Sequence, residues 1–181
     1  MFIYNIALNN IMKITPYLAG VLFGDGTINK GKNRAYAVWI DQHKRNSKVI
    51  KRVVSEFKNI GLKVYDYEFL NKERALVYSK EIFLEFSYIR KNIGKYFKSL
   101  STRNKWEFIS GIFDAEGTVT DRIVIYNNNT QILKEIKNFL EEQKIVCYIY
   151  KFGKTFGLQI YQRNSVGIFK MRVNSVRIHS F

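Results

Sequence analysis

The sequence has very few of the residues that build disulfide and soft-metal centres. Cys147 is its only cysteine, and His43 and His179 are its only histidines. One cysteine excludes an internal disulfide, fits a reducing compartment and rules out a zinc ribbon or knuckle. Two histidines so far apart exclude the histidine–metal nucleases and the zincins.

Long apolar runs, prolines and flexible linkers are also scarce. The longest apolar stretches are far shorter than the roughly 18 residues that cross a bilayer. The opening Met1–Ile6 has neither the basic lead nor the apolar core of a signal peptide. One proline and no Ser/Gly-rich run leave no clear flexible linker. We therefore expect an intracellular protein, in the cytoplasm or an organelle matrix, that is not secreted.

Acidic residues are outnumbered by basic ones. The 181 residues include 30 Lys and Arg against 15 Asp and Glu, for a formal net charge of +15. A protein this basic usually binds a polyanion, with nucleic acid as the first candidate; the alternative is that the charge serves solubility alone. The apolar content of 46% is enough for one sizeable core or two small fused ones.

One segment of the sequence occurs twice, once in each half of the chain. Residues 17–26 read Tyr-Leu-Ala-Gly-Val-Leu-Phe-Gly-Asp-Gly, and residues 108–117 read Phe-Ile-Ser-Gly-Ile-Phe-Asp-Ala-Glu-Gly. Residues four apart lie on one face of a helix, so each copy predicts a helix with a flat strip that can touch another helix backbone to backbone. The small residues that form the two strips are Gly20 and Gly24, then Gly111 and Ala115.

Each copy ends in a carboxylate followed by glycine, as Asp25-Gly26 and Glu116-Gly117. The glycine predicts the end of the helix, because glycine accepts the left-handed conformation that commonly terminates helices. The carboxylates would then lie at the negative end of the helix dipole, which disfavours a bare acid and favours a bound cation. One acid–glycine pair is usually only a helix stop, but two copies in the same frame predict a shared function.

The order of the predicted elements also repeats. Both halves read helix, two strands, helix, two strands, helix, which predicts an α+β fold of two similar αββαββα halves. We expect an N-terminal lead at 1–14, a first half at 15–91, a linker at 92–104 and a second half at 105–181. The linker is short and contains aromatic residues, so we expect it to pack and to join the two lobes closely.

Basic, aromatic and amide side chains are common on the predicted strands and in their turns. Such a mixture suits phosphate contacts combined with readout of base edges in a groove. For each residue alone, a solvated surface charge or a core aromatic is the simpler interpretation, and we prefer that interpretation for Trp39. As a set, they predict a DNA-binding surface made of Lys30, Lys32, Arg34, Tyr36, Gln42, Lys44, Arg122, Tyr126, Asn127, Lys151, Lys154, Tyr161 and Arg163.

The two repeated segments resemble the paired signature helices of the LAGLIDADG homing endonucleases, in the single-chain form that carries two motifs. The family consensus ends in acid–glycine, and Leu18–Gly26 and Ile109–Gly117 fit it throughout. The resemblance implies two antiparallel sheets that form a saddle over duplex DNA, with the signature helices at its centre. Asp114 fits the family's inner acid position, which faces helix packing and hydrogen bonding, and Phe23 replaces it in the first half.

The resemblance also implies a metal site. Asp25 and Glu116 would be the metal ligands and the central catalytic residues, helped by the backbone carbonyls of Gly24 and Ala115. Hard oxygen ligands suit Mg²⁺, which serves phosphodiester cleavage well, and Ca²⁺ is expected to bind without supporting cleavage.

Further catalytic residues follow from the same resemblance. The family often has an amide or basic side chain near each scissile phosphate, and Gln42 and Asn127 occupy such positions here. We therefore count both among the catalytic residues. A lysine near the acid is also common in the family. Lys30, Lys44 and Arg163 are the candidates for that role, and the sequence does not choose among them.

The resemblance implies a monomeric, intron-encoded endonuclease that cuts both strands of a long, non-palindromic DNA target and leaves 3′ overhangs. Two alternatives use the same scaffold: an intron RNA-splicing maturase and a catalytically inactive DNA-binding regulator. The presence of both acids favours the enzyme, because a pure binder has no need of two. An intein-borne form is not expected, since the sequence finishes at His179-Ser180-Phe181 without the expected Asn.

Overall fold

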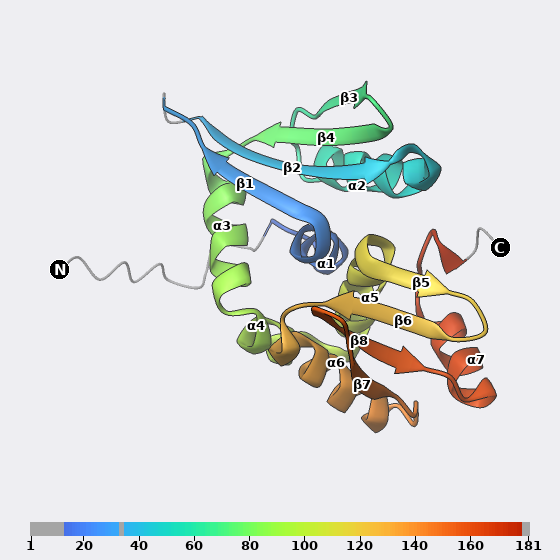
Figure 1. Cartoon of the computed structure of the whole chain (residues 1–181). Helices are drawn as coiled ribbons and strands as arrows, with labels where there is room; N and C mark the ends of the chain where they lie inside the picture. The colour runs from blue at the N-terminus through green and yellow to red at the C-terminus, as the bar shows by residue number, and fades with distance from the viewer. Residues whose placement is uncertain (1–12, 33–34, 179–181) are drawn as a thin grey trace.

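The computed structural model describes residues 13–32 and 35–178 and has two similar halves (Figure 1). The first half and the segment after it contain α1 (Pro16–Asp25), β1 (Gly26–Lys30), β2 (Tyr36–His43), η1 (Lys44–Asn46), α2 (Ser47–Asn59), β3 (Tyr65–Phe69), β4 (Lys72–Tyr78), α3 (Lys80–Lys91) and α4 (Ile93–Ser99). The second half contains α5 (Thr102–Glu116), β5 (Gly117–Val119), β6 (Ile123–Asn127), α6 (Thr130–Glu142), β7 (Tyr148–Phe152), β8 (Thr155–Ile160) and α7 (Arg163–Arg172).

Each half has one four-stranded antiparallel sheet with the same strand order. The orders are β1-β2-β4-β3 and β5-β6-β8-β7, so the strand that follows each signature helix lies at one edge. The registers also correspond, because Gly26 lies opposite Ile40 and Gly117 lies opposite Ile125. The predicted α+β fold with two pseudo-symmetric αββαββα halves is therefore confirmed.

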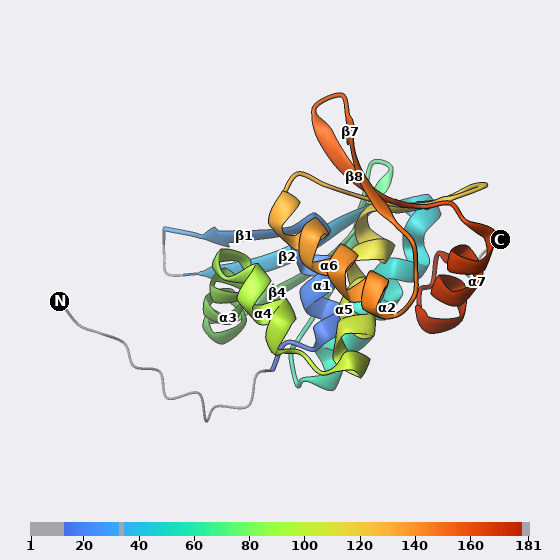
Figure 2. The same ribbon diagram turned by 90° about the horizontal axis from the view of Figure 1, so that it is seen from below.

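Side chains alternate across each strand, so one face of each sheet packs on helices and the other stays open. In β2, Val38 and Ile40 are fully buried, whereas Trp39 and Asp41 are partly exposed. Helices α2 and α3 contact the buried side of the first sheet, and α6 contacts that of the second. In Figure 2 the helices of both halves lie mainly below the strands, so the two open faces share one side of the molecule.

The sequence predicts helix caps at Thr15, at Asn46 or Ser47, at Ser101 or Thr102 and at Asn129 or Thr130, and three of these four helices begin with a capping side chain there. Thr15 caps α1, Ser101 caps α5 and Asn129 caps α6, each through a side-chain oxygen that accepts a backbone N–H of the first turn. Asn46 precedes α2 without capping it. Its side-chain amide donates instead to Oε1 of Gln42 at 2.9 Å.

The segment between the halves is packed, as its aromatic residues predict. Helix α4 occupies much of 92–104, and its Phe97 is 1% exposed. The Phe97 ring lies edge-on 5.4 Å from that of Phe108 and 6.1 Å from that of Phe139. Helix α5 begins at Thr102, inside the expected linker, so the exact division into domains stays a prediction.

The sequence pattern predicts strands at residues 35–41 and 145–150, and the boundaries of both strands differ in the structure. Strand β2 continues to His43, which brings Gln42 into the sheet. Strand β7 begins only at Tyr148, because Ile145 and Cys147 are buried in the core before strand pairing starts. Both changes affect residues next to the candidate site or the open faces.

Helix length agrees with the absence of long apolar runs in the sequence. Helix α5 has 15 residues. Within residues 13–32 and 35–178, no helix is both long enough and apolar enough to pass through a bilayer.

Candidate active site and nucleic-acid surface

Helices α1 and α5 touch backbone to backbone along the strip of small residues. A Cβ added to Gly20 would lie 2.2 Å from the carbonyl oxygen of Phe108. A Cβ added to Gly111 would lie 2.0 Å from the carbonyl oxygen of Tyr17. The contact is reciprocal, because each glycine accommodates the backbone at the corresponding position of the other helix. The repeated glycine spacing therefore marks the interface between the two halves.

The glycines that end α1 and α5 are needed for space and not for a left-handed conformation. Gly26 has a φ of −73° and Gly117 a φ of −83°, both with extended backbone, so the predicted left-handed stop is wrong. A Cβ at Gly26 would lie 2.2 Å from the carbonyl oxygen of Leu22, and one at Gly117 would lie 2.3 Å from the ring of Phe113. The chain therefore passes directly from each helix into a strand, with the acid as the last helical residue.

The touching helix ends bring Asp25 and Glu116 together. A Cβ at Gly24 would lie 2.5 Å from the Cβ of Ala115 and 3.0 Å from the Cγ of Glu116. Burial raises the pKa of Asp25 to about 6, against an opposing effect of the Arg177 charge. Burial, followed by repulsion from Asp25, raises the pKa of Glu116 to about 7. Two desolvated carboxylates that repel each other form a site suited to a cation.

The donor set fits a hard divalent cation. Magnesium in proteins commonly uses one or two carboxylates and completes its shell with water and substrate phosphate. Asp25 and Glu116 supply two carboxylates from separate helices. In the part of the chain that the structure describes, no three His, Cys, Asp or Glu residues gather into a closed metal site. The carbonyls of Gly24 and Ala115 stay the predicted additional ligands.

Gln42 and Arg177 connect the surroundings of the two acids. Gln42 is 5% exposed, and its side-chain amide donates to Oδ2 of Asp25. Arg177 donates to Oε1 of Gln42 at 3.3 Å and to the carbonyl oxygen of Gly117 at 2.7 Å. Arg177 was not among the predicted residues, because it lies in the irregular segment after α7, where no motif marks it.

The predicted catalytic amide of the second half does not contact its acid. Asn127 ends β6, and its Oδ1 accepts the backbone N–H of Asn129 at 2.8 Å in a local turn. Its catalytic role stays a prediction. The lysine whose charge lowers the pKa of Asp25 is Lys72, at the start of β4, which was not among the candidates.

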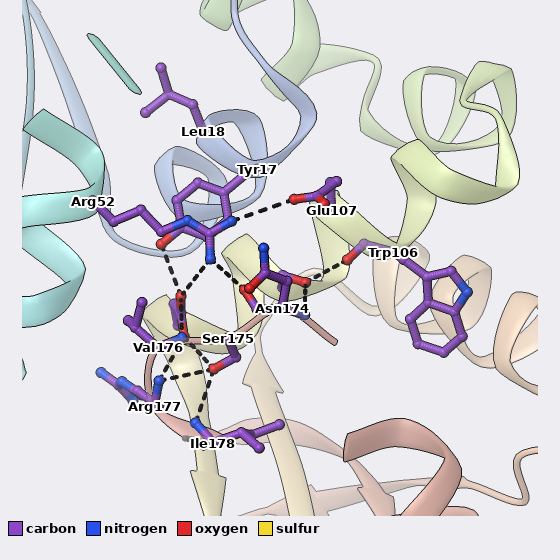
Figure 3. Close-up of polar contacts among 12 residues, drawn as sticks. Tyr17, Leu18, Arg52, Trp106, Glu107, Asn174, Ser175, Val176, Arg177 and Ile178 are labelled. Carbon is purple, nitrogen blue, oxygen red and sulfur yellow. Dashed lines mark hydrogen bonds and ion pairs between the residues drawn. The ribbon is translucent and has the colours of Figure 1, made fainter. Parts of the chain in front are cut away.

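Asp114 holds the C-terminal segment in place. Its side chain is fully buried, and the hydroxyl of Tyr17 donates to its Oδ2 at 2.9 Å. The hydroxyl of Ser175 and the backbone N–H groups of Val176 and Arg177 also donate to this carboxylate (Figure 3). This arrangement agrees with the hydrogen-bonding role expected for the inner acid.

Part of the predicted DNA-binding set lies on the open faces or in the turns that border them. Tyr126 and Tyr161 lie on the open side of the second sheet. Lys32 and Lys154 lie in the β1–β2 and β7–β8 turns. Arg34 lies outside the described residues.

Other members of the set lie elsewhere or are already paired. Tyr36 is on the helix-covered side of β2, with its ring 5.1 Å from that of Phe83. Lys44 and Arg122 form ion pairs with nearby acids at 2.5 and 2.9 Å. The remaining members are exposed residues at element ends or on an edge strand, namely Lys30, Lys151 and Arg163. Their contacts with DNA stay predictions.

Each open face carries a cluster of exposed or partly exposed aromatic rings. The clusters correspond in the two halves. The ring centres of Tyr65 and Tyr78 are 5.7 Å apart in an edge-on contact, and those of Tyr148 and Tyr161 are 5.7 Å apart in a stacked contact. Exposed apolar surface of this kind usually marks a binding site. A Tyr-x-Tyr-x-Phe pattern on β3 and β7 is the signal in the sequence that we missed. The paired aromatic clusters are Tyr65, Tyr67, Phe69 and Tyr78, and Tyr148, Tyr150, Phe152 and Tyr161.

Trp39 lies on the open face of the first sheet, so its interpretation as a core aromatic is wrong. Strand alternation puts it between the buried residues Val38 and Ile40, with its side chain on the opposite face. The guanidinium of Arg74 lies 5.2 Å from the ring centre of Trp39. Asp41 holds that guanidinium through two hydrogen bonds of 2.5 and 2.7 Å.

Comparisons with known proteins agree with this geometry. Residues 104–174 match the LAGLIDADG-like domain family. The chain is 26% identical over 142 residues to the homing endonuclease I-DmoI of Desulfurococcus mucosus, covering 72% of this chain and 71% of that protein. It is 25% identical over 176 residues to a probable translation initiation factor IF-2 of Methanocaldococcus jannaschii. That match covers 87% of this chain but only 14% of the factor.

The fold matches solved structures over nearly the whole chain. The crystal structure of I-DmoI in complex with DNA and Mn has a TM-score of 0.74 at 23% identity, covering 92% of this chain and 99% of that one. The complex of I-DmoI with DNA and Ca has a TM-score of 0.71 at 23% identity, covering 92% of each chain. Residues 104–174 therefore match a LAGLIDADG-like domain, and both halves of the chain have the fold of the I-DmoI structures.

Proposed function

We propose that this chain is a metal-dependent endonuclease that hydrolyses phosphodiester bonds in both strands of duplex DNA. The observation that carries the proposal is the pairing of Asp25 and Glu116 at the touching ends of α1 and α5. Two acids related by a pseudo-two-fold axis suit two DNA strands that are related by the same kind of axis. The similarity to I-DmoI, a homing endonuclease crystallised with DNA and Mn or Ca, supports the proposal.

The open faces of the two sheets are the proposed DNA-binding surface. They lie on one side of the molecule, and the net charge of +15 favours a polyanion. Aromatic, amide and basic side chains on strands suit contacts with phosphates and base edges. We therefore infer that the members of the predicted set that lie on or beside the open faces, together with the paired aromatic clusters, contact the duplex.

Asp25 and Glu116 would hold the metal, with the backbone carbonyls of Gly24 and Ala115 as further proposed ligands. We propose Mg²⁺ for cleavage and Ca²⁺ as an ion that binds without supporting it. A bound metal would supply an activated water and would neutralise charge on the phosphate and the leaving oxygen. The protein's own contribution is to hold two carboxylates together in a largely desolvated position, which their raised pKa values support.

The two halves would act on their strands unequally. Asp25 has Gln42 as a hydrogen-bond donor, which would orient its carboxylate. Among the described residues no side-chain amide donates to Glu116, and the corresponding Asn127 accepts the backbone N–H of Asn129 in its own turn. The proposed cleavage rates of the two strands are therefore different.

The finer features of the proposal follow from the family resemblance and from this asymmetry. We propose a long, non-palindromic target, a cut that leaves 3′ overhangs, an intron-encoded gene and a monomer that acts inside the cell. Unequal open faces support a non-palindromic target. The positions of Asp41 and Arg74 in the first sheet correspond to Tyr126 and Gly157 in the second.

Cleavage of a supercoiled plasmid library of randomised targets tests the proposal directly. With Mg²⁺ we expect linear products from a subset of sequences, and with a chelator we expect none. The Asp25→Asn/Glu116→Gln double variant is the control for a contaminating nuclease. A folded protein that binds DNA but cuts no sequence would overturn the proposal.

An RNA-splicing maturase is the second candidate, and the exposed aromatic rings are the observation that favours it. Rings on an open sheet can stack on unpaired bases as well as contact a duplex. Binding of intron RNA that is tight in both the wild type and the Asp25→Asn/Glu116→Gln variant would favour the maturase. Tight binding of duplex DNA alone would exclude it.

A further inference from the structure

The segment after α7, residues 173–178, is fixed to α5 by hydrogen bonds to Ser110 and Asp114. Figure 3 shows Asn174 to Ile178 of this segment. Ser175 is 1% exposed and donates its hydroxyl to Oδ1 of Asp114. The same oxygen accepts the backbone N–H of Arg177 at 3.3 Å, and Oδ2 accepts that of Val176 at 3.3 Å. Several bonds to one buried carboxylate hold this backbone in a single position. We call residues 173–178 the C-terminal strap.

A second set of contacts connects the strap to both signature helices. The N–H of Asn174 donates to the hydroxyl of Ser110 in α5 at 3.0 Å. Its carbonyl oxygen accepts from the guanidinium of Arg52, which stacks 3.5 Å from the ring centre of Tyr17 in α1. The strap is therefore attached where the two halves meet.

The strap places the side chain of Arg177 next to the ends of the signature helices. Its Nη1 donates to the carbonyl oxygen of Gly117 at 2.7 Å, and its Nη2 donates to Oε1 of Gln42 at 3.3 Å. Gly117 directly follows Glu116, and Gln42 donates to Asp25. Contacts therefore run from Asp25 through Gln42 and Arg177 to Gly117, the residue that follows Glu116.

The contacts use the forked geometry of arginine. The two acceptors belong to different halves, and one planar guanidinium reaches both with separate N–H groups. The Nε of Arg177 is buried and has no hydrogen-bond partner among the described residues. An unpaired buried donor costs free energy. The strap and the two acceptors therefore set the position of the guanidinium, although its Nε–H is left without a hydrogen-bond partner in the described part of the chain.

Among the described residues, the first half has no equivalent of this arrangement. There the chain continues from α3 through Asn92 directly into α4. We propose that Arg177 is a positioning residue for both acids, which fixes Gln42 and the junction between Glu116 and Gly117 and supplies a resident positive charge beside them. This inference rests on the proposed endonuclease function, but the contacts behind it belong to this chain's own strap.

Paired variants test the inference. Arg177→Met removes the guanidinium and keeps the packing of its stem, while Arg172→Met removes the same charge from an exposed site in α7. We expect Mg²⁺-dependent cleavage by Arg177→Met to be about 10–100-fold slower than by Arg172→Met. DNA affinity measured with Ca²⁺ should be equal in the two variants.

Chemical rescue separates positioning from a general loss of structure. Arg177→Lys restores the charge, but one ammonium cannot span both acceptors, so it should recover only part of the rate. Guanidinium ions below denaturing concentrations should speed cleavage by Arg177→Ala and should not do so for Asp25→Asn. Equal cleavage by Arg177→Met and Arg172→Met would overturn the inference.

A measurement without metal or DNA tests the contacts themselves. In nuclear magnetic resonance spectra, the side-chain amide of Gln42 and the backbone amide of Gly117 should shift in Arg177→Met and Arg177→Lys but not in Arg172→Met. Unchanged signals in either folded Arg177 variant would also overturn the inference. If the wild type cuts no DNA, the proposed function fails, while these amide signals still decide whether Arg177 positions its neighbours.

Discussion

At the scale of single residues, the two acids make the free protein sensitive to pH. The pKa of Asp25 is raised to about 6 and that of Glu116 to about 7, chiefly by burial. A carboxyl group with a higher pKa in the folded than in the unfolded protein stabilises the fold while it is protonated. This contribution is complete below about pH 4 and is lost as the pH rises through about 6 to 7.

The metal-free protein should therefore lose stability relative to Asp25→Asn/Glu116→Gln as the pH rises from about 4 to about 7. The neutral amides of the variant remove both ionisations, and the comparison cancels the other titrating groups. Mg²⁺ or Ca²⁺ at about pH 8 should stabilise the wild type and not the variant. Thermal unfolding in chelator and in each ion measures both effects. The same pH dependence in the two proteins would contradict the raised pKa values.

The single substitution Asp25→Asn should abolish double-strand cleavage and leave DNA binding nearly intact. The amide keeps the shape of the side chain but loses the charge that would hold a metal. Separation of supercoiled, nicked and linear plasmid measures cleavage, and equilibrium binding measures affinity. If the variant failed to fold, the effect would be structural and the assigned role would lose its support.

At the scale of elements, the seam between α1 and α5 has no room for a larger side chain. Gly20→Leu and Gly111→Ala should each destabilise the fold by about 1–3 kcal/mol or more, because their Cβ atoms would meet backbone oxygens. Gly167→Ala in α7 is the matched control, since its Cβ would meet nothing within 4 Å. That control should be neutral or stabilising by up to about 1 kcal/mol. The midpoints of denaturant unfolding measure these effects. An unchanged midpoint for Gly20→Leu would contradict the close contact between α1 and α5.

The same helices show what could be predicted from the sequence. The seam could be predicted because the helix period is local and the glycine spacing repeats at Gly20 and Gly111. The family resemblance predicted that Gln42 lies near a scissile phosphate, but it did not predict the hydrogen bond from Gln42 to Asp25. The conformation of Gly26 could not be predicted, because a glycine after a helix fits either a left-handed stop or a crowded extended junction. Only the packing against the last turn decides between them.

Long-range contacts account for most of what the sequence did not reveal. Arg177 reaches the site because Asp114, 63 positions earlier, binds its backbone N–H. No local pattern encodes that contact. Trp39 was misjudged because an aromatic on an alternating strand suits either the core or an open face. The register of β2 settles which face it occupies.

At the scale of the whole molecule, the excess positive charge should govern DNA affinity. The logarithm of the binding constant should fall linearly with the logarithm of salt concentration, because phosphate contacts release counterions. Lys154→Ala in the β7–β8 turn should weaken binding and reduce that slope by about one. Tyr150→Ala should weaken binding without changing the slope, because its ring contributes contact area and no charge.

A salt series of equilibrium binding in Ca²⁺ distinguishes these two kinds of contact. Lys170→Ala, in α7 on the helix side, removes one exposed charge and is the control for net charge. Wild-type affinity in both Lys154→Ala and Tyr150→Ala would mean that the second open face does not contact DNA.

The reciprocal seam has a consequence for the origin of this chain. Gly20 receives the backbone of Phe108 just as Gly111 receives that of Tyr17, so each signature helix is complementary to a copy of itself. A gene encoding one half could therefore have produced a homodimer through an isologous interface. Both subunits of such a homodimer would carry every substitution in the gene. After duplication and fusion, each half could change independently. The strap, which only the second half carries, is the kind of one-sided acquisition that such a fusion permits.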